Sequence, residues 1–456
     1  MKFYNSLTRQ MEEFIPLEEG KVHMYTCGPT VYWDAHIGNF RSYIFEDVLQ
    51  RALEQNGFEV KRAMNITDVG ELTESGEDKM LLGAEREGVT VQEVAKIYTD
   101  RFLRDAGLLN IKVPPAPLLC KASEHIKEQI ELIKTLEEKG FTYQISDGVY
   151  FDTSKFPAYG VLSGQKLEEK EEGARVVVNE EKRNKTDFAL WKFAPQDTKR
   201  QLWESPWGVG FPGWHIECSA MARTYLGQPF DIHCGGIDHI PVHHENEIAQ
   251  SEAAYGVKLA NYWLHGEFLL IDNQKMSKSL GNVYTLSNVI EHGFDPISLR
   301  LYFLGAHYRQ KQNFTWDALQ ATQNALDRMH HLTSGWDWSV VGKIIAESEA
   351  EFNEAIRDDL NTSKALAVFW KTLDSSNSVE DKITTVKWMD QVLGLGLETY
   401  VERAVEVPAA IKLLAEQRWE ARQKGNWTES DRLRDELLGQ GWKMKDGKDG
   451  WTAEKI

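Results

Sequence analysis

The sequence predicts an α/β fold built on a parallel β-sheet, and three consecutive segments near its start carry that prediction. Residues 21–31 have the pattern of a strand that runs into a Gly-Pro turn. Residues 39–55 place apolar side chains at helical spacing, and Gly57 then closes the segment, as glycine often does at a helix C-terminus. Residues 58–69 alternate as a strand does. A strand, a helix and a strand in this order favour a parallel βαβ unit.

The region from about residue 114 to 200 is predicted to be an insertion within this α/β core. It begins at the Pro-rich residues 114–117 and contains a predicted helix over 123–139, followed by short strands. A strongly charged run, residues 166–185, is expected to form a solvated surface loop or hairpin. The core pattern resumes beyond the insertion with two apolar strand-like segments.

The last third of the chain has a different pattern. From Thr315 to Leu397, helical spacing dominates. A short linker around Val405–Pro408 then precedes two more predicted helices and a Gly-rich end that contains tryptophan. We therefore expect three parts: an α/β core with its insertion over 1–314, a helical bundle over 315–400 and a small C-terminal domain over 408–456.

The composition is that of an ordinary globular protein. A chain of 456 residues is too long for one hydrophobic core, and hydrophobic residues make up 42% of it and charged residues 27%. The sequence contains no basic start followed by an apolar run, and no long uninterrupted apolar stretch, so we expect neither a signal peptide nor a membrane span. The four cysteines, which are far apart, suggest reduced thiols, metal ligands or burial rather than disulfides, and hence a cytoplasmic protein.

The charge of the chain is unevenly spread. A formal net charge of −18 disfavours a general nucleic-acid binder. Residues 401–456 are neutral, however, with 11 basic and 11 acidic residues. This tail also holds Trp419, Trp427, Trp442 and Trp451. Its charge permits a contact with RNA without requiring one.

The first candidate for chemistry is the tetrapeptide from His36 to Asn39, which lies between the first strand and its helix. A helix N-terminus presents free N–H groups and a positive dipole end, both of which suit phosphate. Gly38 would let a nucleotide approach the backbone, and His36 would hydrogen-bond phosphate oxygens. Taken alone the signal is weak, because a histidine at such a junction is more often structural.

A second candidate is the run Lys275-Met276-Ser277-Lys278-Ser279, which follows an apolar strand-like segment. Two lysines three residues apart on such a loop can close over a polyphosphate. An isolated pair of this kind is usually only a solvated basic loop. Together with the upstream His-Ile-Gly-Asn, however, this run resembles the paired signatures of class I aminoacyl-tRNA synthetases. The resemblance implies a Rossmann-type core that binds ATP between the two segments.

A third candidate is a metal site. His243 and Glu247 are four residues apart, so on a helix they share one face and can ligate one ion. Cys27, which ends the first strand, and Cys218 would complete a tetrahedral zinc site of N, O and S donors. Spacing alone does not bring Cys27 next to Cys218. A hydrogen-bonded helix face and two buried thiols remain an equally acceptable interpretation at this point.

The order of further motifs resembles the cysteinyl-tRNA synthetase family over essentially the whole chain. The strings are NSLTRQ, MYTCGPTVY, NITDV, GWHIECSAM, FDIH, HHENEIAQS, KMSKSLGN and DDLNT. The resemblance implies zinc ligated by Cys27, Cys218, His243 and Glu247, with the substrate thiol joining the metal. It implies a cysteine pocket lined by Cys27, Gly28, Thr67, Trp214 and Asp238. It places ATP against His36, Gly38, Asn39 and Lys278, with His36, Asn39, Lys275 and Lys278 as the catalytic residues.

The activity that this resemblance implies is activation of L-cysteine with ATP and Mg²⁺, followed by transfer to tRNA(Cys), in a monomer without a membrane partner. The core would be catalytic, the helical bundle would bind tRNA, and the tail would recognise the anticodon. In the tail, Arg418, Arg422, Arg432 and Arg434 would face RNA, and Trp442 or Trp451 would present a ring to an unstacked base.

The sequence departs from the family pattern at three places. Asn39 stands where the signature often has histidine, and Cys234 stands where many members have glycine. Residues 70–80 replace a shorter acidic stretch. Two alternative functions stay open: a cysteine ligase of the mycothiol pathway, which would lack the tail, and a non-catalytic zinc-containing tRNA-binding paralogue, which would not need the intact lysine loop.

Overall fold

The computed structural model describes residues 1–73, 76–164, 179–194, 200–277, 280–399, 409–446 and 450–455. The chain divides into two compact units, Met1–Glu398 and Thr399–Ile456. Most of the predicted charged surface run, at 166–178, and Lys278 of the lysine loop lie outside the described residues. No described helix is long and apolar enough to cross a membrane.

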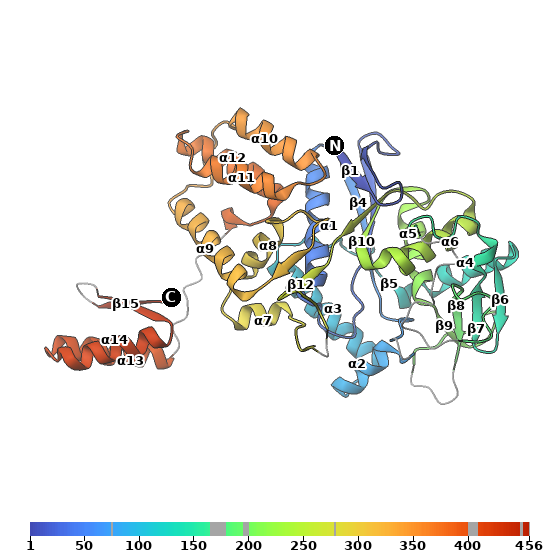
Figure 1. Cartoon of the computed structure of the whole chain (residues 1–456), viewed down its shortest axis with the longest axis horizontal. Helices are drawn as coiled ribbons and strands as arrows, with labels where there is room; N and C mark the ends of the chain where they lie inside the picture. Colours follow the sequence, from blue (N-terminus) through green and yellow to red (C-terminus); the bar gives the residue numbers. More distant parts are fainter. Residues whose placement is uncertain are drawn as a thin grey trace. The chain divides into compact units, whose positions relative to one another are not determined.

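A five-stranded parallel sheet forms the centre of the larger unit, as the sequence predicts (Figure 1). The strand order is β11-β10-β3-β4-β5, and every neighbouring pair is parallel. The bounds are β3 Lys21–Thr26, β4 Glu59–Ile66, β5 Leu119–Lys121, β10 Phe230–Gly236 and β11 Ala260–Gly266. Because β3 pairs with β4 on one side and with β10 on the other, the chain reverses its direction of winding at β3.

The strands are buried on both faces, so successive side chains enter two different hydrophobic layers. Met24 and Ile232 pack in the layer that contains α1, Ile37–Gln55. Tyr25 and Trp263 pack in the opposite layer with α5, Trp214–Leu226. The helix predicted over 39–55 is therefore present with an earlier start, and it lies against the sheet as a βαβ crossover requires.

The region predicted as an insertion is only partly separate from the core. Its strand β5 pairs with β4, with Met64 opposite Leu119 and Ile66 opposite Lys121. A strand of three residues is too short to show a period, so the sequence did not reveal it. Beyond α4, Ile126–Glu138, a four-stranded antiparallel sheet forms in the order β6-β7-β8-β9. Its strands are Thr142–Ile145, Gly148–Phe151, Phe188–Phe193 and Gly210–Pro212.

The remaining elements of the core lie around the sheet. The hairpin of β1 (Lys2–Asn5) and β2 (Gln10–Glu13) precedes it, and α2 (Lys79–Glu87), α3 (Val91–Leu108), α6 (Glu245–Tyr255), α7 (Leu286–Glu291) and α8 (Pro296–Leu304) are its further helices. A small mixed sheet in the order β13-β12-β14 is built from Gln274–Lys275, Leu269–Ile271 and Gln312–Phe314.

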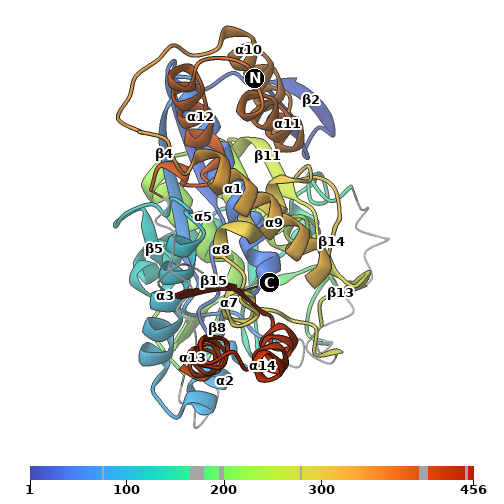
Figure 2. The ribbon, with the colours of Figure 1, turned by 90° about the vertical axis from the view of Figure 1, so that its left-hand side faces the viewer.

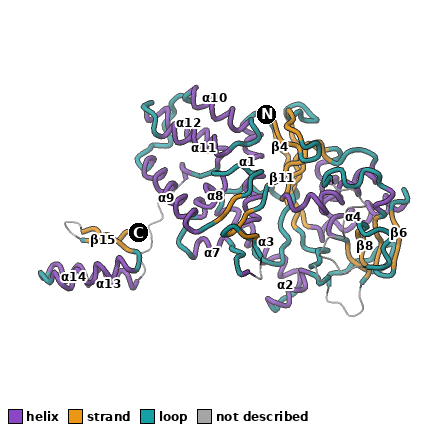
Figure 3. The backbone as a smooth tube through the Cα atoms, in the orientation of Figure 1, coloured by secondary structure: helices purple, strands orange, loops and turns teal. Residues whose placement is uncertain are grey.

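Helices follow without a strand in the region where the sequence predicts a bundle, and Figure 3 shows this change from mixed structure to helix. They are α9 Trp316–Thr333, α10 Ala346–Arg357, α11 Thr362–Leu373 and α12 Val379–Leu393. Figure 2 shows α10, α11 and α12 grouped together. The Gln55 amide at the end of α1 donates to the Trp388 carbonyl of α12 at 2.9 Å, so the bundle packs directly on the helix of the βαβ unit.

The smaller unit consists of α13 (Ala409–Gln423), α14 (Trp427–Gly439) and an antiparallel hairpin of β15 (Trp442–Asp446) and β16 (Trp451–Lys455). Its core contains Ile411, Leu437 and Trp442. The two helices agree with the sequence prediction, whereas the hairpin stands where only a Gly-rich end was expected.

Candidate functional site

The candidate site lies at the carboxyl ends of β3 and β10. These two strands are neighbours, and the Cys27 N–H donates to the Cys234 carbonyl at 3.3 Å, directly after β3 and two residues before the end of β10. In an open parallel sheet, ligands bind outside the carboxyl ends of the strands where the winding reverses. The residues that gather at this edge therefore form the candidate site.

Four potential metal ligands meet there. Cys27 follows β3, Cys218 lies in α5, His243 lies in a π-helical turn over Ile240–His244, and Glu247 lies in the first turns of α6. Their donor atoms all lie within 4.8 Å of one another, and all four residues are buried. The structure thus brings together the two thiols that spacing alone could not relate.

The electrostatics of this group favour bound cations. Burial alone would raise the pKa of the Cys27 thiol. The adjacent Cys218 thiol and His244 lower this pKa by more than burial raises it, so it lies well below its usual value. Burial would also raise the pKa of Glu247. The neighbouring His233 and His243 rings outweigh this effect and lower the pKa below its usual value, so Glu247 is a carboxylate. A buried thiolate and a buried carboxylate side by side need a compensating positive charge. Burial lowers the pKa of His243, but Glu247 and Cys27 raise it by more, so the His243 imidazolium supplies positive charge here and a metal ion would take its place.

Several histidines that the sequence analysis left without a role surround the four ligands. His215 Nδ1 lies 3.0 Å from His243 Nδ1, and His233 Nε2 lies 2.9 Å from Glu247 Oε2. His244 Nε2 lies 3.3 Å from Cys27 Sγ, while its Nδ1 lies 2.8 Å from His265 Nε2. Partners of this kind orient ligands and fix their tautomers. Most of these histidines stand inside the quoted motifs, yet a single sequence does not show which way their rings face.

A second donor set overlaps the first and consists of Cys27, His233, His244 and Glu247. The first set supplies two thiols instead of one. Zinc prefers sulfur and nitrogen donors, so the set with both cysteines fits this metal better.

One atom inside the group supports the fit independently. Glu247 Oε1 is buried and has no hydrogen-bond partner among the described residues, although His243 Nε2 is 3.1 Å away. An orphaned carboxylate oxygen that faces two thiols and an imidazole is well explained by a metal ion. Neither Cys120 nor Cys234 contributes to either donor set among the described residues.

The residues predicted to line an amino-acid pocket lie around this group. The Trp214 ring, at the start of α5, is 4.6 Å from the His243 ring. Thr67 is buried, and its hydroxyl donates to the Glu217 carboxylate and accepts from Asn65 Nδ2 at 2.9 Å. Asp238 is exposed in the turn that follows β10. A side chain on Gly28 would collide with the Asn65 carbonyl, since a Cβ there would lie 1.9 Å from it.

The predicted phosphate-binding residues lie at the N-terminus of α1. His36 is the N-cap: its Nδ1 accepts from the Asn39 N–H at 3.1 Å, and the Asn39 Oδ1 accepts from the His36 N–H at 3.0 Å. This reciprocal capping box fixes both side chains at the positive end of the helix. Asn39 thus has a structural role in the absence of any ligand, which the sequence analysis did not anticipate.

The two signature segments are joined by backbone contacts. The Ile37 N–H donates to the Tyr284 carbonyl at 2.8 Å, and His36 bridges to Thr285, a few residues beyond the lysine loop. Lys275 lies exposed on β13, next to the described part of that loop. The sheet edge therefore carries a thiol-rich group at Cys27 and the candidate phosphate site at His36, nine residues apart in sequence on one connection.

Comparison with protein families and curated proteins gives consistent matches. A model of the catalytic domain of class I tRNA synthetases (C) matches residues 13–324. A cysteine–tRNA ligase 1 from Burkholderia lata is 48% identical over 455 residues, which cover 99% of this chain and 96% of the relative. A cysteine–tRNA ligase from Treponema denticola is 42% identical and covers 99% of both chains. One from Thermococcus onnurineus is 40% identical, covering 100% of this chain and 99% of the relative.

Solved structures match at the level of the fold. The LeuRS–tRNA–LeuAMS ternary complex from Agrobacterium radiobacter has a TM-score of 0.60 at 11% identity and covers 84% of each chain. Mycobacterium tuberculosis methionyl-tRNA synthetase in complex with methionyl-adenylate has a TM-score of 0.54 at 15% identity, covering 82% of this chain and 90% of that one. At such identities the likeness concerns the fold alone, and it confirms the predicted Rossmann-type α/β class.

Proposed function

This chain belongs to the cysteine–tRNA ligase family of class I tRNA synthetases, and on that premise we propose that it activates L-cysteine with ATP and transfers the cysteinyl group to the 3′ end of tRNA(Cys). The observation that carries the assignment to cysteine is the buried group of Cys27, Cys218, His243 and Glu247 beside the helix end at His36. A site for a thiol next to a site for phosphate is what activation of cysteine requires.

We propose that these four side chains hold one zinc ion. When bound, zinc would take the substrate thiol as a thiolate and so select cysteine over the nearly isosteric serine. An apolar pocket separates such similar side chains by only about 1–3 kcal/mol, whereas preference for a thiolate adds to that difference. His215 and His233 would hold His243 and Glu247 in place, and Trp214 would cover the pocket at His243.

The chemistry of activation needs no protein nucleophile. The carboxylate of bound cysteine attacks the α-phosphate of ATP, the new mixed anhydride is cysteinyl-adenylate, and pyrophosphate leaves. Asp238 and Thr67 are proposed to orient the amino acid. His36 and Asn39 at the N-terminus of α1, with Lys275 and Lys278 opposite, are proposed to stabilise the charge that develops on the phosphates, with Mg²⁺ bound mostly by the phosphates themselves.

The second step would pass the cysteinyl group to a hydroxyl of the terminal adenosine of tRNA and release AMP. We propose that the helical region over 315–400 and the C-terminal domain over 408–456 hold the tRNA. The relatives support this function over the mycothiol-pathway alternative, because they bear the name cysteine–tRNA ligase and match this chain through its tail.

Two assays test the proposal. Cysteine-dependent exchange of labelled pyrophosphate into ATP measures activation, and serine in place of cysteine measures selectivity. Charging of tRNA(Cys) measures transfer. Exchange without charging would favour a ligase with another acceptor, and absence of exchange would favour a non-catalytic protein. A Lys278→Ala variant should slow exchange by about 10²–10³, the usual effect of losing one donor that acts in the transition state.

A further inference from the structure

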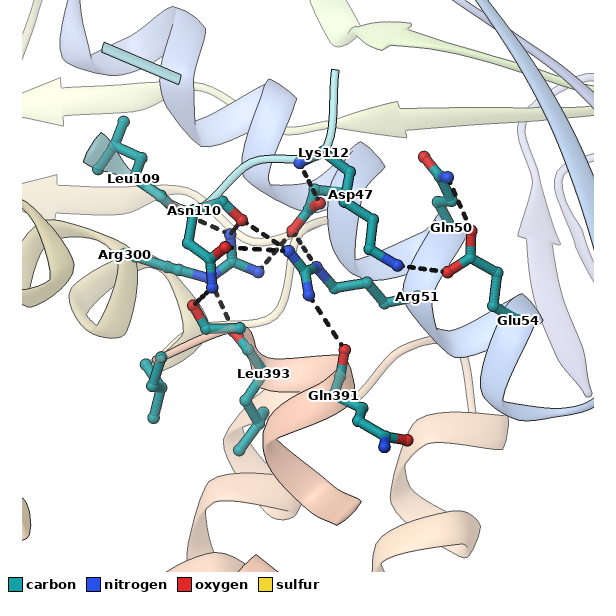
Figure 4. A network of polar contacts seen from close by, with 12 residues as sticks. Asp47, Gln50, Arg51, Glu54, Leu109, Asn110, Lys112, Arg300, Gln391 and Leu393 are labelled. Atoms are coloured by element: carbon teal, nitrogen blue, oxygen red, sulfur yellow. Dashed lines mark hydrogen bonds and ion pairs between the residues drawn. The ribbon is translucent and has the colours of Figure 1, made fainter. Parts of the chain in front are cut away.

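A buried polar network joins the helical region to the helix that carries the candidate phosphate site (Figure 4). We define this Asp47 network by Asp47, Arg51, Asn110 and Arg300. Asp47 and Arg51 lie on α1, Arg300 lies on α8, and Asn110 lies in the turn after α3. All of the residues that it contacts lie in the larger unit.

The centre of the network is the Asp47 carboxylate. Its Oδ2 accepts from Arg300 Nη2 at 2.6 Å and from Arg51 Nε at 2.8 Å, and its Oδ1 accepts from the Lys112 N–H at 2.8 Å. Asp47 and Arg300 are fully buried. Removing two cations and an anion from water is costly unless each has partners, so this arrangement depends on its full set of contacts.

Three further donors of the network reach the C-terminal end of α12, while Arg51 Nη2 and Arg300 Nη1 donate to the Asn110 carbonyl at 2.7 and 3.1 Å. Arg51 Nη1 donates to the Gln391 carbonyl at 3.3 Å, Arg300 Nε donates to the Leu393 carbonyl at 2.7 Å, and Asn110 Nδ2 donates to the Gly394 carbonyl at 2.8 Å. The last carbonyl groups of a helix have no partner within the helix and carry its negative dipole end. Here side chains of the catalytic core satisfy three of them.

These contacts connect α1 with the C-terminal end of the larger unit. Asp47 lies 11 residues after His36 on the same helix, about 16 Å along its axis. The chain leaves the larger unit a few residues after Gly394, at Glu398, and continues into the tail. The network therefore holds the C-terminal end of α12, near the point where the chain leaves the helical region, against α1. The N-terminus of α1 forms the candidate phosphate site.

We propose that the Asp47 network positions tRNA for transfer: it keeps the helical region in register with α1, so that tRNA held by that region and the tail presents its 3′ end to the adenylate. This inference rests on the proposed function. The four members are positioning residues, because none of them contacts the candidate ligand group. They should affect the transfer of cysteine without affecting its activation.

The main variant is Arg51→Met, which removes the bonds to Asp47, Gln391 and Asn110 but leaves the Asp47–Arg300 pair intact. A second variant, Asn110→Gly, removes the bond to Gly394 and the 3.5 Å bond that the Asn110 Oδ1 accepts from Arg51 Nη2. Asn110 has a φ of 52°, a conformation that glycine adopts without strain, so this variant keeps the backbone even if Arg51→Met does not fold. The matched control is Thr372→Val, which breaks the buried bond from Thr372 to Ser348 between α11 and α10, away from α1.

Three measurements are made on the full chain: cysteine-dependent pyrophosphate exchange, the Kd for tRNA(Cys), and the single-turnover rate of transfer from preformed adenylate at saturating tRNA. The network variants should keep exchange and Kd within about twofold and lower the transfer rate about tenfold, as the loss of a positioning contact typically does. The control should change none of the three.

Any other result would overturn either this inference or the proposed function. An unchanged transfer rate in both network variants overturns the inference. A parallel fall in exchange would mean that the network only supports the fold, and a weaker Kd with normal transfer at saturation would mean that it only shapes the binding surface. If the parent itself shows no cysteine-dependent exchange, the proposed function fails instead.

Discussion

Met276 packs directly on Gly38: a Cβ added to Gly38 would lie 2.2 Å from the Met276 Cε atom. The first residue belongs to the lysine loop and the second to the N-terminus of α1, so the two signature segments are in van der Waals contact at this point. The absence of a side chain at residue 38 therefore has a specific use, which is to let the loop approach the helix end where ATP is proposed to bind.

A Gly38→Ala variant should fold normally but activate cysteine poorly. The added methyl group displaces Met276, whose flexible side chain can move, and with it the described part of the loop. We expect the rate of pyrophosphate exchange to fall at least about tenfold, since small displacements of catalytic groups are costly. Gly107→Ala is the matched control, because a Cβ there meets nothing within 4 Å. Equal exchange rates for Gly38→Ala and the parent would contradict this prediction.

The proposed metal site separates the four cysteines by role. Cys218→Ser should abolish binding of zinc, because it removes one of two thiols from the donor group. Cys234→Ala should retain about one zinc per chain, since Cys234 packs in the hydrophobic layer on the α1 side of the sheet. Metal analysis of the purified proteins measures both. Loss of zinc from the Cys234 variant would overturn the assignment of the ligands.

The core of the fold follows from local patterns, and the exceptions have clear causes. The strand–helix–strand unit at β3, α1 and β4 was predicted because each element is long enough to show its period. The strand β5 was missed because three residues show none. The hairpin β15–β16 was missed because Lys and Asp, rather than β-branched residues, dominate the sequence of β15.

The candidate site was predictable only in part, because local spacing does not reveal contacts between residues that are far apart in sequence. The i,i+4 spacing of His243 and Glu247 predicts that they meet, and the two side chains do lie together. Cys27 and Cys218 are 191 residues apart, and only the pairing of β3 with its neighbours and the packing of α5 bring them into contact. The resemblance to a family supplied that relationship, whereas the inward-facing His244 and His265 rings required the structure.

The pH dependence of stability should include a contribution from Glu46. Burial raises the pKa of Glu46 to about 8 from 4.5, although Arg62, 2.8 Å away, opposes the shift. Because the folded pKa is the higher one, this stabilising contribution is complete below the unfolded pKa and is lost as the pH rises through about 8.

A Glu46→Gln variant tests this contribution, because glutamine resembles the protonated carboxyl group and does not titrate. The variant and the parent should have similar melting temperatures at about pH 5, and the variant should melt at the higher temperature at about pH 9. Thermal melts of the two proteins across this range measure the difference between them. A constant difference would mean that Glu46 does not titrate between these values.

Three side chains of the tail that the sequence predicts to face RNA make contacts within the domain instead. Arg418 is buried, and its guanidinium forms two bonds with Asp446, at 2.6 and 2.9 Å. Arg422 also pairs with Asp446, at 3.0 Å. Trp442 is buried in the small core, so it does not present its ring to a base as the sequence suggested. These side chains hold the domain together.

Trp427 is an exposed tryptophan of the tail and a candidate for stacking on an RNA base, and Trp451, half-buried at the start of β16, stays a candidate as well. Trp427 is 60% exposed at the start of α14, and the Arg422 guanidinium lies 5.6 Å from the centre of its ring. Stacking of an unpaired base on such a ring contributes roughly 1–3 kcal/mol. Trp427→Ala should therefore weaken charging of tRNA(Cys) by about 5- to 150-fold, with pyrophosphate exchange unchanged, and Trp427→Phe should restore most of the loss.

The buried Trp442 is the control for the exposed Trp427. Trp442→Ala should lower the melting temperature of the tail, because it removes a large side chain from a core that contains few others. Its effect on charging should therefore follow the fraction of tail that is unfolded and should diminish on cooling. The effect of Trp427→Ala should persist at every temperature at which the tail is folded. If Trp427→Ala charges tRNA as well as the parent does, the exposed ring is not an RNA contact, and the tail must hold RNA through other groups.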